Sequence, residues 1–173
     1  MGTMIEVAVA RLGVDSGSNS YVVILRERDG ERVLPIWIGA PEAEAILLEI
    51  NHVKKERPLT HDLCKALVQA LGARVDRVLV TRVQQGTYFA EVHLVRDGEH
   101  LRVDARPSDS IALALRARAP IFVSAGLLAD GDDQPAEQGP PSPAAPEDEA
   151  RAAAELQDYL RSLRPEDFGR FSL

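Results

Sequence analysis

One stretch near the middle of the chain, residues 104–118, constrains the fold more than any other. It reads D-A-R-P-S-D-S-I-A-L-A-L-R-A-R, so that a charged entry runs directly into an apolar segment. Ser108 suits the N-cap of a helix, and Asp109 suits the positive end of the helix dipole. Apolar residues then fall on nearly every side, which predicts a buried core helix. A phosphate-binding site at the N-terminus of that helix is the sharper interpretation of the same residues.

Length and composition suit one domain with an appendage. The chain has 173 residues, 45% of them hydrophobic, and a single cysteine, Cys64. One cysteine excludes an internal disulfide framework and a cysteine-rich zinc site. No apolar run approaches membrane-spanning length, and the first residues lack the pattern of a secretory signal. We therefore expect a cytoplasmic protein with no membrane partner.

Charge divides the chain into two parts. Residues 1–129 hold 16 Lys and Arg against 16 Asp and Glu, whereas residues 130–173 hold 4 Arg against 11 Asp and Glu. The net charge of -7 therefore comes entirely from the C-terminal part. A neutral body lacks the basic field that draws nucleic acid over long distances, but it does not forbid local contacts with DNA or RNA.

Alternation and turn signals predict an α+β fold with a mostly antiparallel sheet and about three core helices. Strands are expected at residues 4–12, 21–28, 32–38, 75–83, 88–95, 101–105 and 120–123. Helices are expected at residues 42–53, 60–71 and 108–118. Pro35, inside the third strand, predicts that this strand lies at an edge of the sheet or contains a bulge.

Domain boundaries follow from a change in composition after residue 129. Residues 1–129 are predicted to form one domain. Residues 130–147 contain five prolines and several acids, which predicts a flexible linker. Residues 148–173 form a tail with a helix over about residues 149–163, whose apolar stripe is Leu156, Tyr159, Leu160 and Leu163. The stripe either docks on the body or binds a protein partner.

Three segments together resemble a known family. They read L-P-I-W-I-G-A-P-E-A-E-A-I over residues 34–46, R-P-L-T-H-D-L over residues 57–63 and D-A-R-P-S-D-S-I-A-L-A-L-R over residues 104–116. With P-I-F-V at residues 120–123, their order and spacing are similar to the bifunctional nuclease domain family, over roughly residues 4–129. The resemblance implies a compact α+β domain, commonly a homodimer, with a nuclease activity on DNA and RNA that is attributed to plant members.

The same segments contain the groups that metal-assisted phosphodiester cleavage requires. The expected catalytic residues are His61, Asp62, Arg106 and Asp109. The expected ligands of Mg²⁺ or Mn²⁺ are Asp62, Asp109, Asp104 and Glu42. His61 would act as general base or position the attacking water, and Arg106 would bind the phosphate. This site requires the N-termini of the helices at residues 60–71 and 108–118 to lie side by side. No motif for an organic cofactor is present.

A structural polar network is the alternative for these residues. Asp62 and Asp109 are each explained by helix-end electrostatics, and Arg57 and Arg106 are available to pair with acids. Glu42 and Glu44 are two residues apart on a helix and point about 200° apart, so they cannot share one metal. On this alternative the protein is a non-catalytic homodimeric adaptor or regulator.

Apolar strand residues predict a homodimer in either case. Tyr21, Val23, Trp37 and Ile38 form more apolar strand surface than a few short helices can cover. Pairing of edges or faces with a second copy would bury that surface, and two-fold dimers are the commonest such assembly.

Overall fold

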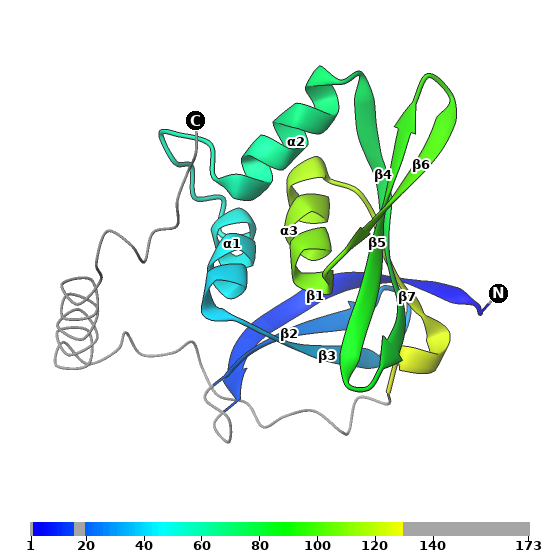
Figure 1. The fold of residues 1–173 in the computed structure, drawn as a ribbon. Coiled ribbons are helices and arrows are strands. Elements are labelled where there is room, and N and C mark those ends of the chain that lie inside the picture. The colour runs from blue at the N-terminus through cyan, green and yellow to red at the C-terminus, as the bar shows by residue number, and fades with distance from the viewer. Residues whose placement is uncertain (1, 16–19, 130–173) are drawn as a thin grey trace, which may run out of the picture. The chain divides into compact units, whose positions relative to one another are not determined.

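One mixed β-sheet organises the described part of the chain, residues 2–15 and 20–129, in the computed structural model (Figure 1). Its strands, in their order across the sheet, are β3 (Val33–Ile38), β2 (Ser20–Glu27), β1 (Met4–Asp15), β7 (Ile121–Ser124), β4 (Ala73–Gln84), β5 (Thr87–Arg96) and β6 (Glu99–Ala105). Neighbouring strands are antiparallel, except that β7 and β4 run parallel. The last strand of the described chain, β7, therefore lies at the centre, where it joins two antiparallel halves.

Helices follow the predicted order along the described chain. They are α1 (Ala40–Ile50), α2 (Thr60–Ala70) and α3 (Pro107–Ala117), with a short 3-10 helix, η1 (Ala125–Leu127), after β7. Figure 1 shows α1, α2 and α3 on the same side of the sheet. The predicted α+β fold with largely antiparallel pairing is confirmed. None of the described helices has both the length and the apolar character needed to cross a membrane. The predicted linker, residues 130–147, and tail, residues 148–173, lie outside the described residues.

The core lies between the sheet and two of the three helices. Ile111, Ala112 and Ala114 of α3 and Ala43 and Ile46 of α1 are fully buried. The strand residues of the same cluster are Val7, Val23, Leu25, Leu34, Ile36, Val78, Val80, Ala90, Val92, Ile121 and Val123. The buried core helix predicted from its all-round apolar pattern is confirmed. Helix α2, by contrast, has no buried residue and lies at the margin of the core.

The start of α3 differs from the sequence-based expectation. The helix begins at Pro107, and Arg106 is the N-cap residue with extended backbone (φ -72°, ψ 146°). A residue before proline favours extended backbone, and the fixed φ of proline suits the first helical position. The prediction of Ser108 as N-cap was therefore wrong, because Ser108 lies inside the first turn, where it is buried. Asp109 occupies the first turn as predicted.

The two edges of the sheet are β3 and β6. Pro35 lies on β3, which confirms the predicted edge position, since proline cannot donate to a central ladder. The dimer prediction rested on apolar residues of β2 and β3. Of these, Val23 is fully buried in the core of its own subunit, whereas Trp37 is 48% exposed. Val23 is therefore not part of any surface that a second copy can reach.

Substitution of Ile111 tests the placement of α3 in the core. Ile111→Ala is expected to lower the free energy of unfolding by about 2–5 kcal/mol, because the buried side chain leaves a cavity. Leu71→Ala, at a position 69% exposed, should change it by no more than about 0.5 kcal/mol. Urea unfolding followed by circular dichroism measures both values. Equal losses in the two variants would contradict this core.

Candidate functional site

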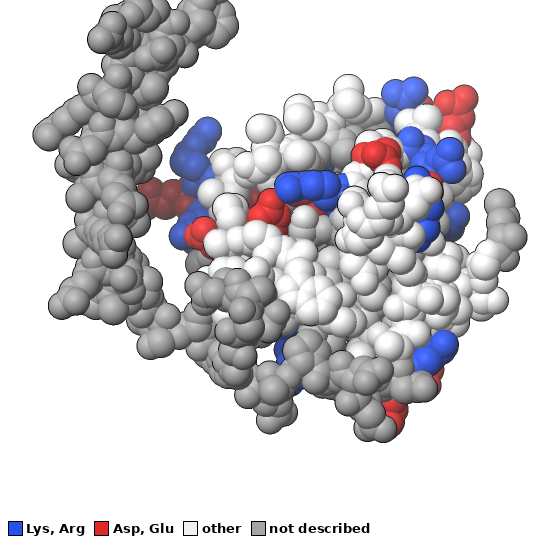
Figure 2. Space-filling view, turned by 60° about the horizontal axis from the view of Figure 1, so that its bottom comes forward, with Lys and Arg blue, Asp and Glu red and all other residues white. Residues whose placement is uncertain are grey.

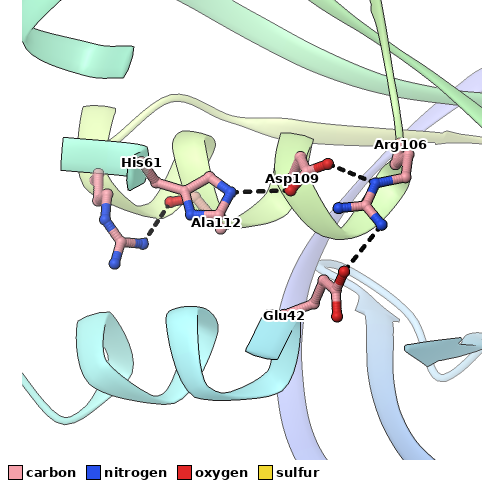
Figure 3. Close-up of polar contacts among 6 residues, drawn as sticks. Glu42, His61, Arg106, Asp109 and Ala112 are labelled. Carbon is pink, nitrogen blue, oxygen red and sulfur yellow. Dashed lines mark hydrogen bonds and ion pairs between the residues drawn. The ribbon is translucent and has the colours of Figure 1, made fainter. Parts of the chain in front are cut away.

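Four side chains form one line of polar contacts beside the helices (Figure 3). Glu42 Oε1 lies 2.9 Å from Arg106 Nη1, and Arg106 Nε lies 2.7 Å from Asp109 Oδ2. The other carboxylate oxygen of Asp109, Oδ1, lies 3.0 Å from His61 Nε2. We call Glu42, His61, Arg106 and Asp109 the Arg106 cluster. It contains three of the four predicted catalytic residues.

Each member of the Arg106 cluster stands at the start of a helix. Glu42 lies in the first turn of α1, His61 in that of α2 and Asp109 in that of α3, while Arg106 is the N-cap residue of α3. Helix N-termini present free backbone N–H groups and a partial positive charge, which stabilise carboxylates and also suit a phosphate. The predicted side-by-side position of the α2 and α3 N-termini is confirmed by the contact between His61 and Asp109.

A cleft of about 540 Å³ opens onto the Arg106 cluster. Its walls come from α1, from the start of α2 and the segment before it, and from the start of α3. They consist of Pro41, Glu42, Glu44, Ala45, Leu48, Pro58, Leu59, Thr60, His61, Arg106 and Asp109. Figure 2 shows that acidic and basic side chains share a band across one face of the molecule and form no large patch of one sign there. The cleft therefore offers a ligand local polar contacts.

Electrostatics set the protonation of the Arg106 cluster. Contacts with Asp109 and Glu42 raise the pKa of Arg106, whose side chain is 65% exposed. Burial acts to raise the pKa of Asp109, but hydrogen bonds from Arg106 and His61 outweigh it and hold that pKa below its ordinary value. Asp109 is therefore ionised at neutral pH and only accepts hydrogen bonds. In neutral His61 the proton then sits on Nε2, which donates to Asp109, and Nδ1 keeps its lone pair.

Asp62 makes a different set of contacts from its neighbour His61. Its Oδ1 accepts a hydrogen bond of 2.7 Å from Arg116 Nε, and its Oδ2 accepts one of 2.9 Å from the backbone N–H of Leu59. Burial acts to raise the pKa of Asp62, but these two donors hold it below its ordinary value. The Arg116 side chain is only 4% exposed and also donates to the carbonyl of Ala112. Asp62 therefore fastens α2 to α3 and does not line the cleft.

The acids predicted to share a metal do not gather in one place. Asp104 is exposed on the edge strand β6, where it pairs in register with Glu91 of β5. Glu42 and Asp109 both contact Arg106, while Asp62 contacts Arg116. Within residues 2–15 and 20–129, no three His, Cys, Asp or Glu side chains are grouped so that they could hold a metal ion. Glu42 and Asp109 share one arginine and Asp62 contacts another, so the carboxylates of these three acids are already engaged by guanidinium groups.

Two features of the site were not predicted from the sequence. The first feature is Arg116, a buried cation in the last turn of an apolar helix. A buried charge requires a partner, and its partner is an acid of the neighbouring helix, Asp62. The second feature is an apolar hollow of about 520 Å³ on the other side of the Arg106 cluster. Its walls include strand residues far from the cluster in sequence, so that no local pattern indicated it.

Comparison with known proteins identifies relatives over most of the chain. A model of the bifunctional nuclease domain matches residues 23–134. A protein of Mycobacterium tuberculosis described as uncharacterized is 41% identical over 167 residues, which cover 94% of this chain and 97% of that protein.

Plant relatives carry the nuclease name. Bifunctional nuclease 2 of Oryza sativa subsp. japonica is 32% identical over 109 residues, which cover 61% of this chain and 34% of that protein. Bifunctional nuclease 1 of Arabidopsis thaliana is 30% identical over 128 residues, which cover 72% of this chain and 39% of that protein. The matched region is therefore well under half the length of either plant protein.

The contact between Asp62 and Arg116 links stability to pH. A carboxylate with a lower pKa in the folded than in the unfolded state stabilises the fold above its unfolded-state pKa, and this contribution is lost as the pH falls through the folded-state pKa. Asp62→Asn should therefore lower the free energy of unfolding at neutral pH by about 1–2 kcal/mol, because Arg116 loses its charged partner. It should also weaken the loss of stability on acidification, measured by urea unfolding at neutral pH and at about pH 3.

Asp29→Asn, in the exposed turn between β2 and β3, is the matched control for this experiment. It should leave both the stability and its dependence on pH close to those of the unmodified chain. An Asp62→Asn variant with the unmodified stability at neutral pH would contradict the role given to this contact.

Proposed function

The chain belongs to the bifunctional nuclease domain family, and from that premise we propose that it cleaves nucleic-acid phosphodiesters at the Arg106 cluster. The observation that carries the proposal is the hydrogen-bonded series His61–Asp109–Arg106 at the edge of an open cleft. A histidine oriented by an ionised carboxylate is an arrangement that supports general-base chemistry. An arginine beside it stabilises charge on a phosphate.

The roles of the three residues follow from their hydrogen bonds. Asp109 accepts the Nε2 proton of His61 and leaves the Nδ1 lone pair to take a proton from an attacking water. Arg106 uses two of its five N–H groups for Asp109 and Glu42 in the described chain, so three N–H groups are available to phosphate oxygens. The attacking oxygen forms the new bond to phosphorus, the bond to the leaving oxygen breaks, and that oxygen takes a proton from solvent.

Glu42 supports Arg106 from the opposite side of the guanidinium. Its carboxylate is 2.9 Å from Nη1, and its side chain is only 19% exposed. Two anchoring carboxylates restrict the rotation of a long and otherwise exposed side chain, so less motion has to be lost when a phosphate binds. We assign Glu42 as a positioning residue for Arg106.

The described residues do not fit a divalent metal held by the protein alone. Mg²⁺ and Mn²⁺ require several oxygen ligands at short distance, and no three suitable side chains are grouped in the described part of the chain. Glu42 and Asp109 are also engaged by Arg106. The proposed mechanism therefore assigns every step to residues of this chain and routes none through a metal.

A non-catalytic homodimeric adaptor is the second candidate function. It is favoured by an apolar stripe on α2, where Leu63 and Leu67 are each 53% exposed and Leu71, just after the helix, is 69% exposed. These leucines are four residues apart and share one face of the helix. An unpartnered stripe of this kind suits a protein partner or a second copy. The homodimer itself stays a prediction.

Substitution of His61 tests the catalytic proposal. His61→Gln should lower the rate of cleavage of a fluorescent single-stranded oligonucleotide by about 100-fold or more, because the general base is removed. His93→Gln is the matched control. His93 also bonds a carboxylate, at 3.1 Å from Glu91, and its side chain is 18% exposed against 15% for His61. His93 alternates with buried Val92, so it lies on the other face of the sheet.

The unmodified chain and the two variants, His61→Gln and His93→Gln, are prepared identically. A contaminating nuclease would then give the same cleavage in all three. Loss of cleavage in His61→Gln alone supports the proposal. Equal cleavage by all three contradicts it, and so does the absence of cleavage by the unmodified chain. That last result, together with a dimer by light scattering, would favour the adaptor.

Chelation tests the conclusion about metals. Treatment with EDTA is expected to leave the melting temperature of the full chain unchanged within about 1 °C, because an ion stabilises a fold only by binding to it. Circular dichroism before and after chelation, and after addition of Mg²⁺ or Mn²⁺, measures the effect. A clear fall on chelation that Mg²⁺ or Mn²⁺ reverses would contradict the conclusion.

A further inference from the structure

The apolar hollow beside the Arg106 cluster has no role in the mechanism above. It has a volume of about 520 Å³, within the range of about 300–1,000 Å³ that is usual for small-molecule sites. Its apolar walls are Val68 of α2, Leu113 of α3, Val92 and Leu94 of β5, and Val103 of β6. Unlike the cleft, which is lined by several charged groups, the hollow offers mainly hydrocarbon.

The hollow exists because α2 does not cover the sheet beneath it. Val103 of β6 pairs in register with Val92 of β5, so both side chains point to the face on which α3 packs. Val92 is buried in the core, whereas Val103 is 47% exposed. Helix α2 contacts α3 and β4 but has no buried residue of its own. The apolar face of the β6 edge is therefore left open.

The hollow and the cleft share one boundary. Thr60, His61, Arg106 and Asp109 line both of them. A phosphate that contacts Arg106 therefore has a polar cleft on one side and an apolar hollow on the other. Arg106 and the N-termini of α2 and α3 complement an anionic group at this boundary, while the hollow complements an uncharged, apolar one.

We propose that the hollow is a base-binding subsite, which takes one unstacked nucleobase of a single-stranded nucleic acid whose adjoining phosphate contacts Arg106. This inference rests on the proposed function and adds the substrate class to it. The two faces of a base are apolar and suit aliphatic walls such as Val68, Val92 and Val103. The polar edges of the base keep their contact with water through the mouth beside exposed Val103.

Single strands and sequence tolerance both follow from this placement. A base in a duplex is paired and stacked, and it must be extruded before it can enter a hollow, whereas a base in a single strand is free to do so. Hydrogen-bonding side chains read the edge of a base. Apart from the weakly donating thiol of Cys64, the hollow places such groups only at the boundary that the phosphate occupies. The hollow therefore accepts a base without selecting which one.

Binding of a fluorescent mononucleotide to the full chain tests the proposal without any cleavage step. The probe is 2-aminopurine riboside 5′-monophosphate, and its affinity is measured by fluorescence titration. Val103→Asp should weaken binding by about tenfold or more, because it places a charge in the apolar wall. Val83→Asp is the matched control, since Val83 is also a strand valine, is 43% exposed and does not line the hollow. It should change the affinity by less than about twofold.

A second measurement requires no variant. A single-stranded oligonucleotide should displace the probe from the unmodified chain, whereas a blunt duplex of the same sequence should displace it at least about tenfold less well. Equal displacement by both, or equal binding by the Val103→Asp and Val83→Asp variants, would overturn the subsite. Displacement by an alkyl phosphate but by neither nucleic acid would also overturn it and indicate a lipid-like ligand.

The subsite and the proposed function fail in different ways. Probe binding is measured on variants of the hollow, whereas cleavage is measured on His61→Gln, so each proposal has its own readout. Normal probe binding together with undiminished cleavage by His61→Gln would remove the catalytic proposal and leave the subsite standing. Loss of cleavage in His61→Gln with no effect of Val103→Asp on binding would remove the subsite and leave the catalytic proposal standing.

Discussion

Polar contacts between α2 and α3 determine where the candidate site lies. Helix α2 has no buried residue, so hydrophobic burial contributes little to its position. Three polar contacts to α3 take that role: His61 with Asp109, Asp62 with Arg116, and Lys65 Nζ with the backbone carbonyl of Arg116 at 2.8 Å. One of these contacts belongs to the Arg106 cluster itself. His61, the proposed general base, therefore also helps to position α2.

This attachment has consequences for the space around the site. Because α2 rests on α3 and β4 and does not cover the β5–β6 edge, one cavity opens on each side of the boundary formed by His61, Arg106 and Asp109. A more deeply buried α2 would close the apolar hollow. The low burial of α2 gives this helix little hydrophobic stabilisation. It also leaves space for a ligand next to the charged groups.

Paired charges reconcile the proposed phosphate site with a domain that has no net charge. Arg106 and Arg116 are held by Asp109 and Asp62, so neither arginine contributes to a field that reaches far from the surface. Recognition of an anion then depends on the unused N–H groups of Arg106 and on helix N-termini, which act over short distances. Such a site recognises a ligand through short-range contacts and adds little long-range electrostatic attraction that would speed its association.

Local sequence patterns were sufficient for the elements of this fold, and the requirements of a nuclease site indicated which of them would meet. The all-round apolar pattern after Asp109 identified α3 as the core helix, Pro35 placed β3 at an edge, and the polar starts of α2 and α3 were predicted to meet. The first two features depend on residues close together in the chain, where periodicity and proline geometry act. The meeting of α2 and α3 was expected because a nuclease site needs groups from both helices, and the residues that meet are 48 positions apart. The choice of partner for each charge does not depend on local sequence.

Only the tertiary structure could show that Asp62 faces Arg116 whereas its neighbour His61 faces Asp109, or that Asp104 stands apart on β6. The packing of α2 also leaves the side chain of Val103 exposed, which only the tertiary structure shows. These outcomes depend on how separate elements pack against one another, as the 54 positions between Asp62 and Arg116 illustrate. Secondary structure follows from the near order of residues, but a site is made by whichever side chains the packing brings within a few ångströms of one another.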